Sequence, residues 1–239
     1  MKTTKHTFLL LFILSSIQLI AQNPARDLIK EKKIEAQLKS IDSTIVNTYR
    51  KATIAMDQNN LKLADSLYSI VYTKAPTFDP VIRRLGMIRL QLGNSKEGIE
   101  LCEKAIAINK TSYNLLSLAY CYFIDVNNRN LGKASSLLKE AQTLPDGDDP
   151  DILSLLGQIA LQEQNIVDFR SVTSELLEKH SDLMVTHYFA AILASQDGKW
   201  KLAENEIQQA KKMGLPEETV KAFLDSGVSS NLNKRQYGY

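Results

Sequence analysis

Several residue types that often define a fold are scarce in this chain. Its 239 residues include two cysteines, six prolines, ten glycines and one tryptophan. Two cysteines exclude a small fold held mainly by disulfides, and the low glycine and proline content excludes collagen-like and low-complexity chains. With 44% hydrophobic and 23% charged residues, the composition is that of a folded globular protein. The length fits one large domain, two small ones or an array of repeats.

A surplus of positive charge is also missing. The whole chain carries 29 basic and 27 acidic residues, and two of the basic ones, Lys2 and Lys5, lie in an N-terminal segment that we expect to be removed. Without that segment the charges balance. Binding to a nucleic-acid backbone needs a basic surplus concentrated on one face. We therefore expect no nucleic-acid partner.

The N-terminus has the pattern of a secretory signal peptide. Lys2 and Lys5 precede an apolar run over residues 8–20, and the small residue Ala21 stands before a polar stretch. A spanning helix needs about 20 apolar residues, so this run is short for a membrane anchor. We expect residues 1–21 to be a signal peptide cleaved after Ala21, with an uncleaved anchor as the alternative. The mature protein is then exported, periplasmic or secreted, and has no membrane span.

Small residues recur with a period of about 34 residues. One set consists of Ala64, Gly98, Ala134 and Ala203. A second set, about 12 residues earlier in most repeats, consists of Ala52, Gly86, Ala119, Gly157 and Ala191. Around them apolar residues follow a three- and four-residue spacing, which indicates helices, and strand-like alternation is absent. Polar breakers such as Gly93-Asn94 separate the two halves of each repeat, and Pro76, Pro145 and Pro216 mark the ends of repeats.

This pattern resembles the tetratricopeptide repeat (TPR), W-x2-L-G-x2-Y followed by A-x3-F, a small residue and proline. Repeat two shows Ile82, Leu85, Gly86 and Arg89, then Gly98, Cys102 and Ala105. Repeat three shows Leu115, Leu118, Ala119 and Tyr122, then Ala134, Leu138 and Ala141. The resemblance implies an all-α, right-handed α-solenoid of about five helical hairpins with flanking N- and C-terminal helices. In such a fold small residues let paired helices touch, and stacked hairpins share one core.

The repeats divide the chain as follows. After the signal peptide we expect an amphipathic helix within residues 22–44, which either caps repeat one or runs into it. The TPR array covers 45–216, with hairpins at about 45–78, 79–111, 112–149, 150–183 and 184–216. A C-terminal capping helix at 217–225 and a flexible tail at 226–239 follow. In repeat four Phe169 replaces the small residue, and we expect it to push the two helices apart there.

Motifs for catalysis or metal binding are lacking. His180 and His187 are predicted to lie in different helices, and no third strong ligand is evident. The acidic stretch 146–151 lacks the alternating ligands and terminal glutamate of a calcium loop, so we interpret it as a turn with a helix N-cap. No phosphate-binding glycine loop, nucleophile elbow or zinc-protease motif occurs. We expect no catalytic residues, metal or cofactor, and keep a metal-dependent enzyme only as an alternative.

Cys102 and Cys121 fall in neighbouring helices of repeats two and three. In an exported chain they could form a disulfide, provided their Cα atoms lie within about 7 Å. The other interpretation is two small core residues. Both interpretations remain open from the sequence.

The resemblance also implies a binding surface. First helices of successive TPR repeats commonly line an inner groove that holds a peptide or a partner's helix. The groove positions in this chain are Tyr49, Arg83, Met87, Tyr113, Leu116, Tyr120, Phe123, Tyr188 and Ile192. The lysine and asparagine set with which some TPR proteins clamp a chaperone's terminal carboxylate is missing, with Tyr49 and Thr53 in its first two places.

These observations predict a non-catalytic scaffold whose partner is another protein of the cell envelope or a secreted one. An alternative is a structural subunit of an envelope secretion, surface-assembly or motility complex that uses its outer faces. The sequence leaves the partner's identity and the oligomeric state open.

Overall fold

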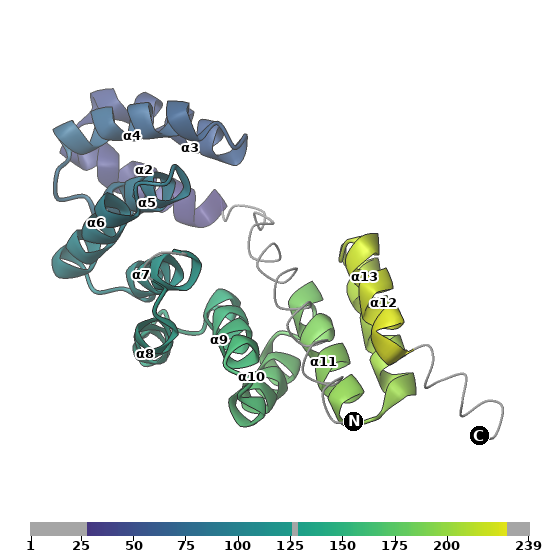
Figure 1. Cartoon of the computed structure of the whole chain (residues 1–239). Coiled ribbons are helices and arrows are strands. Elements are labelled where there is room, and N and C mark those ends of the chain that lie inside the picture. The colour runs from purple at the N-terminus through teal and green to yellow at the C-terminus, as the bar shows by residue number, and fades with distance from the viewer. Residues whose placement is uncertain (1–27, 126–128, 229–239) are drawn as a thin grey trace, which may run out of the picture. The chain divides into compact units, whose positions relative to one another are not determined.

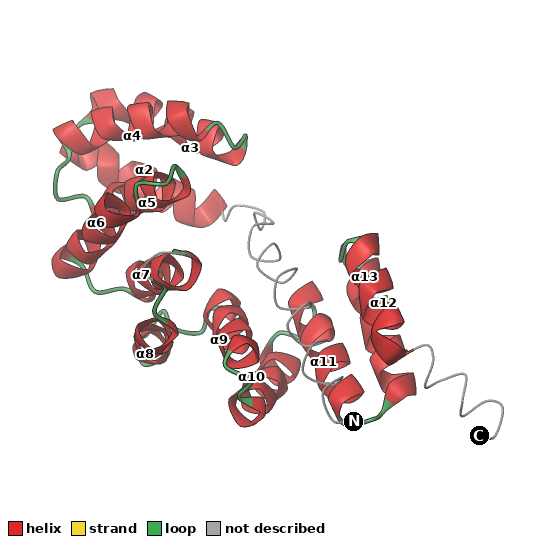
Figure 2. Cartoon of the chain, in the orientation of Figure 1, coloured by secondary structure: helices red, strands yellow, loops and turns green. Residues whose placement is uncertain are grey.

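The computed structural model describes residues 28–125 and 129–228, and every regular element in these ranges is helical (Figures 1 and 2). The expected signal peptide, Ala21 and residues 229–239 of the predicted tail lie outside the described ranges. No helix in the described part is long and apolar enough to cross a membrane. The predicted all-α fold class of stacked hairpins is confirmed.

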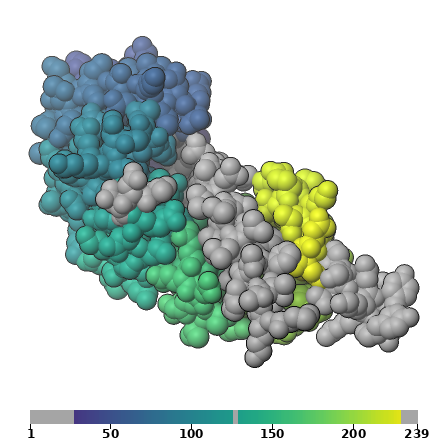
Figure 3. Space-filling view, in the orientation of Figure 1, coloured from purple at the N-terminus to yellow at the C-terminus, as the bar shows by residue number. Residues whose placement is uncertain are grey.

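The chain divides into two compact units. The N-terminal unit, Asn23–Asp149, holds α2 and three hairpins. Its helices are α2 (Leu28–Ile41), η1 (Ser43–Ile45), α3 (Val46–Asp57), α4 (Leu61–Lys74), α5 (Asp79–Gln91), α6 (Ser95–Ile108), α7 (Ser112–Ile124) and α8 (Leu131–Gln142). On the face seen in Figure 3, side chains of the blue and teal helices pack against one another over this unit.

The C-terminal unit, which contains Pro150–Tyr239, holds two hairpins and the helical end. Its helices are α9 (Pro150–Gln162), α10 (Ile166–Lys179), α11 (Met184–Gln196), α12 (Trp200–Lys212), α13 (Glu217–Phe223) and η2 (Leu224–Val228). Val220 and Phe223 of α13 are buried in the same core as α11 and α12. These residues close the apolar end of the last hairpin.

The small residues lie where the two helices of a hairpin cross. A Cβ atom added to Gly86 would stand 2.8 Å from the backbone oxygen of Gly98, and one added to Gly98 would stand 2.8 Å from the oxygen of Gly86. The corresponding pairs Ala52 with Ala64 and Ala191 with Ala203 are fully buried. The helices therefore approach backbone to backbone at these positions, as the periodicity predicts.

The turn inside a hairpin repeats as well. The residue before the second helix's N-cap has a left-handed backbone in four repeats: Asn59, Gly93, Gln164 and Gly198, with φ between 56° and 89°. In three repeats the N-cap of the second helix is an asparagine whose side chain accepts a hydrogen bond from a backbone N–H of that helix: Asn60, Asn130 and Asn165. A left-handed residue ends the first helix and the cap begins the next, which explains the polar breakers in the sequence.

Repeat four departs from the other hairpins. Phe169 is fully buried and its ring meets that of Phe189 from α11 edge to face, with centroids 5.2 Å apart. Phe189 in turn lies against Gly157 of α9, where an added Cβ would collide with the ring. α9 and α10 approach each other less closely than the helices of the other hairpins. The expected separation is present, and an aromatic pair fills the space.

Helix α2 has a placement that neither alternative from the sequence describes. It ends at Ile41, and Asp42 caps the short η1 turn before α3, so the chain does not run straight into repeat one. Leu38 is buried in the core of the N-terminal unit, whereas Leu28, Ile29 and Ile41 are more than half exposed. Contacts of Glu31 and Lys30 reach α5 and α7. α2 therefore lies across the first helices of three repeats.

Candidate functional site

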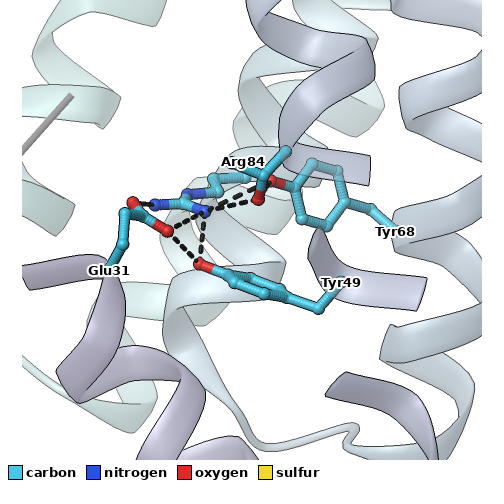
Figure 4. A network of polar contacts seen from close by, with 5 residues as sticks. Glu31, Tyr49, Tyr68 and Arg84 are labelled. Carbon is cyan, nitrogen blue, oxygen red and sulfur yellow. Dashed lines mark hydrogen bonds and ion pairs between the residues drawn. The ribbon is translucent and has the colours of Figure 1, made fainter. Parts of the chain in front are cut away.

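The densest polar cluster in the described residues lies between α2 and the first two hairpins (Figure 4). Its centre is Arg84 of α5, which is 6% exposed. The Arg84 guanidinium forms an ion pair with Glu31 of α2 and donates hydrogen bonds to the hydroxyls of Tyr49, Thr53 and Tyr68. Four helices thus meet at one buried cation.

The cluster is internally bonded. The Tyr49 hydroxyl donates to Glu31 Oε2 at 2.9 Å, while the hydroxyls of Thr53 and Tyr68 lie 2.8 Å apart. The rings of Tyr49 and Tyr68 meet edge to face at 5.8 Å, and the Arg84 guanidinium lies 5.2 Å from the Tyr49 ring centroid. Because a buried charge is tolerated only when it is paired and hydrogen-bonded, this cluster holds Arg84 in one arrangement.

Burial and charge shift the pKa values here. Burial, partly offset by Arg84, raises the pKa of Tyr49 well above its ordinary value, so the phenol stays neutral and can donate to Glu31. Burial alone would lower the pKa of Arg84, but Tyr68, Tyr49 and Glu31 together raise it beyond its ordinary value. Arg84 is a permanent cation at every pH at which the protein folds.

A second ion pair joins α2 to repeat one. Arg50 of α3 donates from Nε and Nη2 to the two carboxylate oxygens of Glu35, at 2.9 and 2.6 Å. This pair is more exposed than the Arg84 cluster, with 56% of the Arg50 side chain accessible. Near the N-terminus of α2, the Lys30 ammonium lies 4.3 Å from the ring centroid of Tyr113 on α7. α2 thus contacts the first helix of each of the three repeats.

We call the surface that α3, α5 and α7 present toward α2 the first-helix face. Tyr49, Arg84 and Tyr113 contact α2 or its carboxylates there, and Thr53 accepts a hydrogen bond from Arg84. Arg83 and Met87 stand 34 residues after Tyr49 and Thr53, so they occupy the equivalent positions of α5. Leu116 and Tyr120 are the corresponding residues of α7, because they keep the same offsets from the small residue Ala119.

The nine residues predicted to line a groove fall into two groups. Arg83, Met87, Tyr113, Leu116 and Tyr120 are half-buried, with part of each side chain accessible. Tyr49, Phe123, Tyr188 and Ile192 are buried. Tyr49 belongs to the Arg84 cluster, and Phe123 is a buried residue of α7. Tyr188 and Ile192 belong to the core of the C-terminal unit, where Tyr188 also meets Phe189 at 6.3 Å.

The histidines and the acidic stretch are bound to other parts of the chain. His187 pairs with Glu206 of α12 through Nδ1 at 2.7 Å, and its Nε2 faces the backbone oxygen of Ser181 at 3.0 Å. Asp146 accepts from the backbone N–H of Ser112, so it caps the start of α7 rather than α9. In the part of the chain that the structure describes, no group of three or more His, Cys, Asp or Glu side chains could hold a metal ion.

Cys102 and Cys121 are buried free thiols with their sulfur atoms 3.7 Å apart. They join α6 of repeat two to α7 of repeat three. The hydrogen bond with Cys102, and then burial, raise the pKa of Cys121 above its ordinary value. Because the thiolate is the reactive species, Cys121 should react slowly once the protein has folded.

We expect oxidative refolding to close a Cys102–Cys121 bridge with little movement. Titration of the unfolded, unreduced protein should find no free thiols after refolding with a glutathione couple and two after refolding in reductant. The bridged form should be more stable by about 3 kcal/mol, since it closes a loop of nearly 20 residues in the unfolded chain. Two free thiols after oxidative refolding would contradict this prediction, and the Cys102→Ser variant gives the unbridged reference.

No family model and no curated protein matches the sequence. Solved structures, however, match the fold. PilW, a type IV pilus biogenesis factor, aligns with a TM-score of 0.67 at 11% identity, covering 82% of this chain and 89% of its own. PilF from Pseudomonas aeruginosa aligns with a TM-score of 0.65 at 15% identity, covering 83% and 94%. YrrB, a TPR protein, gives 0.50 at 13% identity, covering 78% and 95%.

The fold is of the TPR type. At these identities the likeness carries the arrangement of helices alone, and the TPR-type hairpins explain why the small residues recur. The Arg84 cluster has no counterpart in the repeat pattern, because its carboxylate comes from α2, outside the repeats. Sequence reasoning missed both Arg84 and Glu31. One signal was present: Arg50 and Arg84 stand 34 residues apart, at the same position of successive repeats.

Proposed function

We propose that this protein is an exported, non-catalytic scaffold that binds a peptide segment or a helix of another cell-envelope or secreted protein through the first-helix face. One observation carries the proposal. On the first-helix face of α5 and α7, the side chains of Arg83, Met87, Tyr113, Leu116 and Tyr120 remain partly accessible. Tyrosine, arginine and methionine are enriched in protein interfaces, where aromatic and arginine side chains supply most of the binding energy.

Two further observations support a scaffold. The polar groups of the Arg84 cluster are engaged with one another. YrrB is described as having an unusual peptide-binding site, and PilW as a type IV pilus biogenesis factor. Export is supported by the signal-peptide pattern of residues 1–21.

Photo-crosslinking in the native cell tests the binding face. A photoreactive amino acid placed at Tyr120 or Arg83 should give one discrete protein adduct. With the crosslinker at Leu116 instead, the Tyr120→Ala/Arg83→Ala variant should not form this adduct, and its helical circular dichroism should be unchanged. The matched control places the same crosslinker at Lys62, an exposed position on α4. Adducts at Lys62 but none at Tyr120 or Arg83 would overturn the proposal.

A second candidate function is a structural subunit that uses the outer faces. The second helices expose large apolar side chains: Leu63 is 47% and Ile70 51% exposed on α4, and Val167 is 73% exposed on α10. Leu63 and Ile70 are seven residues apart, so they lie on one face of α4. Crosslinks at Ile70 and Val167, insensitive to Tyr120→Ala, would favour this assembly role over the first-helix face.

A further inference from the structure

Two arginines at equivalent positions of successive repeats bind two carboxylates of one helix. Arg50 and Arg84 each stand two residues before the small residue of their repeat, Ala52 and Gly86. Arg50 holds Glu35 in a two-pronged ion pair, and Arg84 holds Glu31. Glu31 and Glu35 are four residues apart on α2, so they lie on one face, about 6 Å apart along the helix axis.

The apolar contacts of α2 follow the same face. Leu38 is fully buried in the core of the N-terminal unit, and Ile34 packs against that core. Together the four anchors stand at positions i, i+3, i+4 and i+7: Glu31, Ile34, Glu35 and Leu38. This spacing is the one by which an amphipathic helix docks on a surface of another protein.

α2 is only partly buried. Leu28 and Ile29 are each 70% exposed and Ile41 is 51% exposed, so most of the large apolar residues of α2 lie outside the core. The Arg50 side chain is 56% exposed and the Glu35 side chain 22%, so this ion pair is less buried than that of Arg84 with Glu31. The most deeply buried attachments of α2 are the Glu31 carboxylate and the Leu38 side chain.

We infer that α2 occupies the site of the partner, which is an amphipathic helix of another protein that binds the first-helix face. This helix carries two glutamates one turn apart, and each glutamate is followed three residues later by a large aliphatic residue. This inference rests on the proposed function and adds the partner's chemistry and the means of regulation. The incoming helix places its carboxylates on Arg84 and Arg50 and displaces α2. The half-buried residues Arg83, Met87 and Tyr120 belong to the same face, and their accessible parts offer the partner further contacts.

The short connection makes α2 a strong competitor. Only Asp42 and the η1 turn separate α2 from α3, so α2 meets its site at an effective concentration of the order of millimolar. A free helix with the same contacts, present at micromolar concentration, would occupy a small fraction of the sites. The partner therefore gains access either by making additional contacts or when the hold of α2 weakens.

A labelled peptide with the α2 sequence, residues 28–41, is the probe for the first experiment. We expect the full-length Glu31→Gln/Glu35→Gln chain to bind this peptide at least tenfold more tightly than the wild-type chain does, measured by fluorescence anisotropy. The substitutions weaken α2 in the chain and leave Arg50 and Arg84 in place. The matched control peptide carries glutamine at both glutamate positions and should bind the variant chain at least tenfold more weakly. Equal binding of the two peptides would overturn the inference.

A second variant guards against misfolding of the first. Arg50 is solvent-accessible, so the full-length Arg50→Glu chain should fold normally. It should prefer a peptide in which arginine replaces Glu35 over the peptide with the natural sequence, whereas a chain with Glu31→Gln alone should show the opposite preference. If the preference between these two peptides does not reverse with the charge at position 50, the inference fails. This holds whatever the Glu31→Gln/Glu35→Gln chain does.

The remaining outcomes separate this inference from the proposed function. If light scattering shows a wild-type dimer that the peptide dissociates, the occupant is α2 of a second copy, and the inference of a separate partner fails. If discrete crosslinks form at Tyr120 while neither variant chain discriminates between the peptides, the inference fails and the proposed function stands. If the peptides discriminate and no crosslink forms at Tyr120 or Arg83, the proposed function fails.

Discussion

The Arg84→Met variant is expected to lose about 3–5 kcal/mol of stability, because the substitution leaves the Glu31 carboxylate without its cation in a nearly closed site. The side chain of Glu31 is 12% exposed and that of Arg84 is 7% exposed. Methionine fills a similar volume, so the loss comes from the unpaired carboxylate and from three hydroxyls that lose a donor. Urea unfolding followed by circular dichroism measures the loss.

Arg89→Met is the matched control on the same helix. Arg89 also makes polar contacts, with Asp65, Glu97 and Ser69, but the Glu97 side chain is 51% exposed and that of Arg89 19% exposed. Because solvent screens these charges, the cost of Arg89→Met should be about 1 kcal/mol or less. Hydrogen exchange should place the loss from Arg84→Met in α2, α3 and α5. Equal losses from the two substitutions would show that the Arg84 cluster is no more than a set of surface ion pairs.

The hairpins could be predicted because their cause is local and repeated. Two helices can cross with their backbones in contact only where neither carries a bulky side chain, so the requirement appears at the same place in each repeat. Gly86 and Gly98 show it directly, since each would collide with the other's backbone if it had a side chain. A requirement that recurs several times in phase is visible even when any single repeat is degenerate.

Repeat four was predictable only in part. The bulk of Phe169 predicts that α9 and α10 separate, and they do. The filling of the resulting space was not predictable, because it depends on Phe189, which comes from the next repeat and lies on Gly157. A pattern within one repeat does not say which side chain of a neighbouring repeat enters the space.

The predicted groove residues show a second limit. Position in the repeat indicates which side of a first helix a residue occupies, and this places Arg83 and Tyr120 among the accessible residues. It does not indicate what covers that side. Tyr49 is buried because α2 lies over it, and the ion pair of Glu31 with Arg84 joins residues 53 positions apart. The hydrophobic pattern of α2 identifies a helix and leaves its site on the array undetermined.

Two glycine-to-alanine substitutions in second helices are expected to change stability in opposite directions. Gly98→Ala in α6 should cost about 2–3 kcal/mol, because the new methyl group would stand 2.8 Å from the Gly86 oxygen and 3.0 Å from the Leu90 nitrogen. Both atoms belong to the backbone, so only a shift of α5 relative to α6 relieves the collision. Gly132→Ala in α8 meets nothing closer than Asn130 Oδ1 at 3.7 Å. It should stabilise the protein by about 0.5 kcal/mol, since alanine restricts the unfolded chain and favours the helix.

The opposite signs separate crossing geometry from helix propensity. Propensity alone favours alanine at both positions, so any loss at Gly98 measures the backbone contact between α5 and α6. Denaturant midpoints of the two variants and the wild type give the comparison, and hydrogen exchange should show faster opening of α5 and α6 in Gly98→Ala alone. A stabilising Gly98→Ala substitution would mean that the hairpin opens at little cost. The period of small residues would then need a cause other than close packing of paired helices.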